Sequence, residues 1–131
     1  MKAPKQGDPA QQFTLRNTSG KDIRFKGWKL AEVDNYNPLG KDPQTGFATG
    51  SVRWKERAVY QTESGKIVCH KLGCSKVAGE VDRGEVKVIS EASAGLSFLG
   101  VEEEVRFFFS GDSLAKDLFA ELGIEDVETI D

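Results

Sequence analysis

The chain has 131 residues, of which 38% are hydrophobic and 30% are charged, and its net charge is −3. This composition is typical of one soluble globular domain and excludes a disordered chain. No apolar run approaches the ~20 residues of a membrane-spanning helix, and the polar start MKAPKQGDPAQQ lacks the apolar stretch of a signal peptide. We therefore expect a cytoplasmic protein with a short disordered lead-in over residues 1–10 and a single domain over residues 11–131.

Two strands are predicted near the start of this domain. Residues 12–17, QFTLRN, alternate apolar and polar side chains, and residues 23–33, IRFKGWKLAEV, follow after the polar turn NTSGKD. The alternation in the second strand slips by one residue at Gly27, which predicts a β-bulge there.

Residues 34–50, DNYNPLGKDPQTGFATG, are the least regular stretch and hold two prolines and three glycines. Loops of this length are uncommon in compact domains and are often functional. Tyr36, Leu39 and Phe47 are side chains that a solvated linker would not need. They predict either a loop that folds back onto the core or a loop that forms part of a binding surface.

The clearest local pattern is a β-hairpin. Residues 51–62, SVRWKERAVYQT, alternate clearly, with Glu56 as the exception on the apolar face, and the short turn Glu63-Ser64-Gly65 leads into KIVCHKL. Residues 84–90, GEVKVIS, predict a further strand. In the first hairpin strand one face is predicted to point to the core and the other to solvent. The core face carries Val52, Trp54, Ala58, Tyr60 and Thr62, and the solvent face carries Arg53, Lys55, Arg57, Val59 and Gln61.

The hydrophobic period becomes helical after Gly100. VEEEVRFFFS places Val101, Val105, Phe108 and Phe109 on one face, with three glutamates in the first turn. SLAKDLFAELGI predicts a second helix that Asp112 or Ser113 can cap and that ends at Gly123. The acidic end EDVETID can add an edge strand through Val127 and Ile130.

The order of these elements, strands first and helices last, predicts the fold class. We expect an α+β fold, in which a mostly antiparallel sheet of about five strands is followed by two C-terminal helices packed on one face.

Both cysteines and the only histidine lie in KIVCHKLGCS, residues 66–75. A structural zinc site needs four ligands, and adjacent residues of a strand point to opposite faces. A Cys69–Cys74 disulfide would need a sharp turn at Leu72-Gly73. We favour a strand in which Cys69 is a core residue and His70 lies on a solvated or half-buried face, with Cys74 in the following turn. This interpretation assigns no metal ligand.

The basic residues Arg53, Lys55 and Arg57 project from one face of the predicted hairpin. Residues 1–76 hold 14 Lys plus Arg against 7 Asp plus Glu, and residues 77–131 hold 4 against 14. This split indicates either that the two parts attract each other or that the first part meets an anionic partner. A basic sheet face can bind single-stranded nucleic acid, but Trp54 and Tyr60 are predicted on the opposite face and the protein is acidic overall.

Motifs of catalysis and cofactor binding are missing. The sequence has no phosphate loop, dinucleotide fingerprint or nucleophile elbow, and its carboxylates lack the spacing of a calcium loop. We therefore predict that the protein is not an enzyme and assign no catalytic residue and no cofactor.

RWKERAVYQTESGKIV, residues 53–68, resembles a hairpin of small uncharacterised bacterial proteins in which Arg-Trp-x-Glu leads to an aromatic residue, a Thr and a Gly turn. Ile67 stands where those proteins have an aromatic residue. The stretch SLAKDLFAELGI followed by ETID is also similar to their ends. The resemblance implies a bacterial cytoplasmic protein and carries no activity.

Together these patterns favour a non-enzymatic binding or adaptor module that contacts a protein partner or a second copy of itself and does not contact a membrane. The predicted contact residues are Tyr36, Leu39, Phe47, Arg53, Lys55 and Arg57. The alternatives are single-stranded nucleic-acid binding through the basic face, and a small-molecule-binding protein or enzyme with a pocket under the 34–50 loop.

Overall fold

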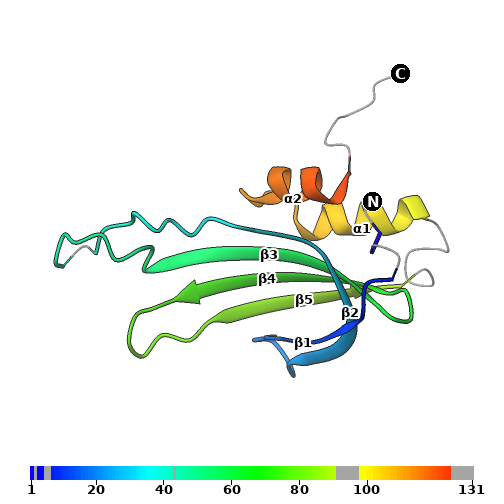
Figure 1. The fold of residues 1–131 in the computed structure, drawn as a ribbon, viewed down its shortest axis with the longest axis horizontal. Helices are drawn as coiled ribbons and strands as arrows, with labels where there is room; N and C mark the ends of the chain where they lie inside the picture. Colours follow the sequence, from blue (N-terminus) through cyan, green and yellow to red (C-terminus); the bar gives the residue numbers. More distant parts are fainter. Residues whose placement is uncertain (2, 5–6, 43, 91–97, 125–131) are drawn as a thin grey trace, which may run out of the picture.

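The computed structural model describes residues 1, 3–4, 7–42, 44–90 and 98–124. The elements are β1 (Gln11–Leu15), β2 (Ile23–Asp34), β3 (Arg53–Thr62), β4 (Ile67–Ser75), β5 (Arg83–Ile89), α1 (Phe98–Phe108) and α2 (Ala115–Leu122). The strands form one antiparallel sheet in the order β1-β2-β3-β4-β5, and both helices lie on one of its faces (Figure 1). The predicted α+β fold class is confirmed. Neither helix of the described chain is long and apolar enough to cross a bilayer.

The hairpin between β3 and β4 has the predicted turn. The amide of Thr62 donates to the carbonyl of Lys66 at 2.8 Å, and Gly65 takes a φ of 90°, which favours glycine because it lacks a Cβ. β4 is longer than predicted, however. It pairs with β3 as far as Ser75, so Gly73 and Cys74 lie inside the strand and not in a turn.

The sheet curls until its first strand approaches its last. The amide of Thr18, just after β1, donates to the carbonyl of Gly84 at 2.8 Å, and a ring nitrogen of His70 lies 3.0 Å from the carbonyl oxygen of Arg16. Figure 1 shows β1 and the start of β2 turned under the sheet, away from the helices. The curl therefore covers part of the sheet face that the helices leave open.

Each face of the sheet carries its own core. On the concave face, Leu15, Ala58, Tyr60 and Val68 are buried, and the Tyr60 ring lies 4.9 Å from that of Phe13 and 5.5 Å from that of Phe25. On the helix face, a larger cluster joins the strands to the helices through Leu30, Ala31, Val59, Ile67, Cys69, Ile89, Val101, Val105, Phe109, Leu118, Phe119, Leu122 and Ile124.

The helices pack on the face of β3 that the alternation assigns to solvent. Val59 is completely buried under them, while Ala58 and Tyr60 are buried on the opposite side. The prediction of a solvated face for Arg57 and Val59 is therefore wrong. Alternation separates the two faces of a strand, but it does not reveal that the middle of β3 is covered on both.

Three local predictions also need correction. The register shift in β2 falls between Lys29 and Ala31, and Gly27 is paired normally with Gln11 and Thr62. α1 begins at Phe98, so its first turn holds no acidic residue and the three glutamates come later. α2 begins at Ala115 with Leu114 at the cap position, so the predicted cap residue Asp112 accepts from the amide of Leu114 just before the helix. Gly123 ends the helix with a left-handed φ of 74° as predicted.

The predicted segments at the two ends of the chain are described only in part. Met1 packs against the helix-side core with its ammonium 2.7 Å from a carboxylate oxygen of Glu102, and the indole nitrogen of Trp28 donates to the carbonyl of Asp8. Disorder over the rest of residues 1–10 stays a prediction. The edge strand proposed through Val127 and Ile130 lies outside the described residues.

The backbones of β2 and β3 approach each other closely at Gly27. A Cβ at this position would lie 2.0 Å from the carbonyl oxygen of Gln61 on β3, whereas a Cβ at Gly73 would meet only the carbonyl oxygen of Arg83 at 3.8 Å. We expect Gly27→Ala to lower the free energy of unfolding by about 2–4 kcal/mol, since the strands must separate. Gly73→Ala is the matched control. It should leave the free energy of unfolding unchanged or raise it by about 0.5–1 kcal/mol. Urea denaturation measures both, and equal effects would contradict the steric argument.

Candidate binding surface at the open end of the sheet

The helices cover only one end of the sheet. Figure 1 shows both helices over the half of the strands next to the β3–β4 turn, while the β2–β3 loop extends beyond them at the other end. The last contacts between helices and strands are the ion pair of Arg57 with Asp112, from the α1–α2 connection, and Lys71, whose ammonium lies 4.5 Å from the centre of the Phe108 ring. The part of the sheet beyond these contacts is open on its helix side.

The β2–β3 loop, residues 35–52, is held by its own hydrogen bonds. The amides of Thr49 and Gly50 both donate to the carbonyl of Gly40 at 3.1 Å, and the amide of Asp42 donates to the carbonyl of Phe47 at 2.9 Å. At its base, the amide of Asn37 donates to the hydroxyl of Ser51 at 2.7 Å. In its described parts, residues 35–42 and 44–52, the loop is therefore a narrow hairpin with a defined backbone.

The three apolar residues predicted in this loop have two different environments. Tyr36 packs edge-on against Trp54 with the ring centres 5.0 Å apart, and the ammonium of Lys76 lies 4.8 Å from the Tyr36 ring centre and donates to its hydroxyl. Leu39 and Phe47, in contrast, are 77% and 73% exposed. Tyr36 thus anchors the base of the loop, and Leu39 and Phe47 present apolar surface to solvent.

The three basic residues of β3 also differ from one another. Arg53 is exposed and forms a two-point ion pair with Glu80, with nitrogen–oxygen distances of 2.9 and 2.7 Å. Hydrogen bonds from Arg53 and Ser75 lower the pKa of Glu80 to about 2. Lys55 is exposed, and it forms no ion pair with any carboxylate in the described part of the chain.

Arg57 is only 8% exposed and belongs to the packed interior. Its guanidinium pairs with the carboxylate of Asp112 and donates to the backbone carbonyls of Glu56, at 2.9 Å, and Leu72, at 3.2 Å. The structure therefore brings Tyr36, Arg53 and Lys55 together at the open end and places Leu39 and Phe47 on the adjoining loop. It separates Arg57 from them in burial and in bonding.

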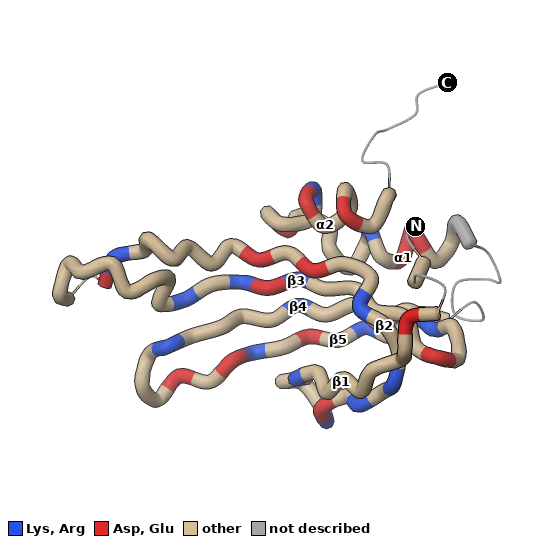
Figure 2. Tube along the Cα trace, viewed as in Figure 1, with Lys and Arg blue, Asp and Glu red and all other residues tan. Residues whose placement is uncertain are grey.

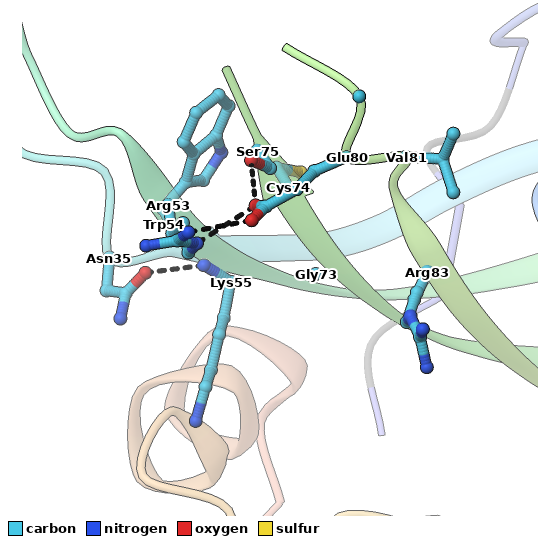
Figure 3. Close-up of a pocket in the computed structure, with 11 residues that line it drawn as sticks. Asn35, Arg53, Trp54, Lys55, Gly73, Cys74, Ser75, Glu80, Val81 and Arg83 are labelled. Carbon is cyan, nitrogen blue, oxygen red and sulfur yellow. Dashed lines mark hydrogen bonds and ion pairs between the residues drawn. The ribbon is translucent and has the colours of Figure 1, made fainter. Parts of the chain in front are cut away.

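A cavity of about 600 Å³ opens where the β2–β3 loop meets the sheet. Figure 3 shows Arg53, Lys55 and Arg83 around it, with Gly73 between the strands that carry Lys55 and Arg83. Glu80 and Val81, from the β4–β5 connection, form part of its wall. The pocket predicted under the loop therefore has a counterpart at the loop base, although Phe47 does not line it.

A second cavity, of about 430 Å³, lies on the concave face and is lined in part by Glu56, Tyr60 and His70. Burial lowers the pKa of His70, although the hydrogen bond to the Arg16 carbonyl acts in the opposite direction, and burial with nearby carboxylates raises the pKa of Tyr60 to about 12. A neutral His70 and a protonated Tyr60 are polar groups that line this cavity at neutral pH.

The two cysteines are free thiols on opposite faces of β4. Cys69 is fully buried in the helix-side core, and Cys74 is buried on the other face. They are five strand positions apart, or about 17 Å, which is far beyond the span of a disulfide. Among the residues that the structure describes, no three His, Cys, Asp or Glu side chains are grouped to hold a metal ion.

Comparison with known protein families, with curated protein sequences and with solved structures finds no match for this chain. The assignment of the site therefore depends on the geometry of the chain itself.

The sequence patterns missed four residues of the open end, namely Gly73, Lys76, Glu80 and Arg83. The sequence patterns predict no element between KIVCHKL and GEVKVIS, and they place Cys74 in a turn. Their neighbours are set by the register of β3 with β4 and of β4 with β5. A prediction of the register between GEVKVIS and KIVCHKLGCS would have placed Gly73 next to Arg83.

The Arg57–Asp112 pair joins the helix connection to the middle of β3. Burial alone would raise the pKa of Asp112, but the amide of Leu114 and the guanidinium of Arg57 lower it below the ordinary value of 3.8. The pair therefore adds stability that is complete above about pH 4 and is lost as the pH falls through the lowered pKa.

We expect Asp112→Asn to reduce the free energy of unfolding by about 3 kcal/mol at pH 7, because it leaves the buried Arg57 without a counter-charge. The difference from the wild type should shrink below pH 4. Urea denaturation between pH 3 and pH 8 measures this difference, and Asp117→Asn, on α2, is the control. A difference that does not depend on pH would contradict the role of the charge.

Proposed function

We propose that the protein is a non-enzymatic binding or adaptor module of the cytoplasm that contacts a protein partner through the β2–β3 loop. The observation that carries this proposal is the exposure of Leu39 and Phe47 on a loop whose backbone is fixed by hydrogen bonds. Large apolar side chains on an ordered backbone lose little conformational entropy when they bind, which is how anchor residues of interfaces act.

The charge next to the loop supports a partner of defined chemistry. Lys41 in the loop and Lys55 and Lys76 at its base are exposed, while the carboxylate of Glu80 is neutralised by Arg53. Figure 2 shows basic positions along β3 beyond the helices and acidic positions gathered on α1 and α2. We therefore expect the partner to offer an apolar pocket bordered by acidic side chains.

Nucleic-acid binding is less well supported by the same surface. Base stacking needs aromatic faces beside the basic residues, but Trp54 and Tyr36 pack against each other and Tyr60 is buried in the concave core. The partner could also be a second copy of this chain, because its helices carry acidic residues. The experiment must therefore distinguish a second copy from a different protein.

The test compares the wild type with a Leu39→Ser/Phe47→Ser variant. Both residues are exposed, so thermal stability should stay the same. Cross-linking in extracts of the source cells, treated with nuclease, identifies candidates, and binding to each purified candidate is then measured by calorimetry. We expect at least a tenfold loss of affinity in the loop variant, as for anchor residues of other interfaces. Phe107→Ser is the control, because Phe107 is 76% exposed but lies on α1.

An unchanged affinity of the loop variant for every partner of the wild type would overturn the proposal. If nuclease treatment abolished the cross-linking of every partner, the surface would be assigned to nucleic-acid binding. Sedimentation equilibrium tests the remaining occupant: a dimer of the wild type that the loop variant does not form would assign the loop to a second copy of the chain.

A further inference from the structure

Gly73 is a glycine in the interior of a strand with no structural reason to be one. The pairing of β4 with β3 and with β5 is uninterrupted at this residue, and its φ is not in the left-handed region. A Cβ at Gly27 or Gly84 would lie 2.0 Å from a backbone oxygen, whereas a Cβ at Gly73 would make only an ordinary contact at 3.8 Å. Glycine weakens a strand interior and often marks a place where a ligand approaches the backbone.

Two basic side chains border the space that Gly73 leaves open. The sheet register places Lys55 of β3 and Arg83 of β5 directly beside Gly73, one on each side. Figure 3 shows both side chains extending to the same side of the sheet. Adjacent strands are ~4.8 Å apart, so the backbones of Lys55 and Arg83 are ~10 Å apart, which leaves room for one tetrahedral anion between their side chains.

The charges around this space do not cancel. Arg53 is paired with Glu80, and Arg57 is paired with Asp112. Lys71 and Glu85 are direct cross-strand partners in the next row. Lys55 and Arg83 form no ion pair with a carboxylate of the described residues. The carboxylates that line the two cavities next to Gly73 are Glu80, which is paired with Arg53, and Glu85, which lies beside Lys71. The space above Gly73 therefore has two uncompensated positive charges.

The surrounding hollow is large enough for a small ligand. Gly73 and Arg83 line both the cavity of about 600 Å³ at the loop base and an adjoining cavity of about 410 Å³, which also includes Arg57 and Lys71. Thr18, Ser19 and Glu85 also line the adjoining cavity. Such a hollow accommodates an anionic head group together with an attached small molecule.

We propose that the row Lys55, Gly73 and Arg83 binds a phosphate-type oxyanion, with Arg83 and Lys55 on its two sides and the open face of Gly73 beneath it. A guanidinium can donate two parallel hydrogen bonds to such an anion, and the ammonium adds a point charge. The site is independent of the partner contact proposed for Leu39 and Phe47, and either proposal can fail without the other.

The test measures binding of inorganic phosphate and of phosphoserine, at constant ionic strength, by the amide chemical shifts of the isotope-labelled protein. We expect saturable shifts that centre on Gly73 and its strand neighbours. Lys55→Gln and Arg83→Gln should each weaken binding about tenfold. Gly73→Val keeps both charges but fills the open space, and it should abolish binding while the protein remains folded.

Two control variants separate the site from general electrostatics and from the loop. Lys21→Gln removes an exposed charge of the β1–β2 turn, and Leu39→Ser/Phe47→Ser removes the apolar loop residues. Both should bind phosphate as the wild type does. Equal affinity for phosphate and phosphoserine would support a site for the free oxyanion, and tighter binding of phosphoserine would support a phosphomonoester.

Shifts that do not saturate in the millimolar range would overturn the proposal. It would also be overturned if Lys21→Gln weakened binding as much as Arg83→Gln, or if Gly73→Val bound phosphate normally. Thermal unfolding with and without phosphate confirms that each variant is folded and gives a second measure of binding through the stabilisation of the native state.

Discussion

Two short helices cannot cover a sheet of long strands, and this difference in length organises the molecule. The ten residues of β3 extend about 34 Å, whereas the eleven residues of α1 extend about 16 Å. The helix-side core therefore forms at one end only, around Val59, Val105 and Leu118. The other end is stabilised by strand pairing, by the Tyr36–Trp54 contact and by the Arg53–Glu80 pair. Both proposed sites lie at this end.

Some of the opposite charges in the two parts of the chain form ion pairs with each other inside the fold. Arg53 and Arg57 come from the basic first part of the sequence, and their partners Glu80 and Asp112 come from the acidic second part. Asp112 has a second role, because its carboxylate also accepts from the amide of Leu114 just before α2. One buried carboxylate thus fixes the entry to α2 and neutralises a strand arginine. These two pairs use Arg53 and Arg57, two of the 14 basic residues of the first part, and Lys55 is not in either pair.

Local patterns were sufficient for the hairpin, the order of strands and helices, and the end of α2 at Gly123. Each of these depends on residues close in sequence: an alternating pattern, a turn with glycine, or a left-handed helix end. The placement of the helices was not predictable in this way. The curl brings β1 back over the concave face through contacts such as Thr18 to Gly84, 66 residues apart. Both faces of β3 thereby become buried, and no property of β3 alone indicates this.

The candidate site was predictable to a similar extent. The irregular loop and its apolar residues were visible in the sequence, but not that Tyr36 packs on Trp54 while Leu39 and Phe47 stay exposed. Arg53, Lys55 and Arg57 are equivalent in an alternating pattern. In the structure Arg53 is paired at the surface, Lys55 has no ion pair among the described residues, and Arg57 is buried. Removal of the Arg57 charge acts on stability through Asp112, whereas removal of the Lys55 charge acts on the surface alone. A binding defect caused by a change of Arg57 would therefore report on the fold, whereas one caused by a change of Lys55 would report on a ligand.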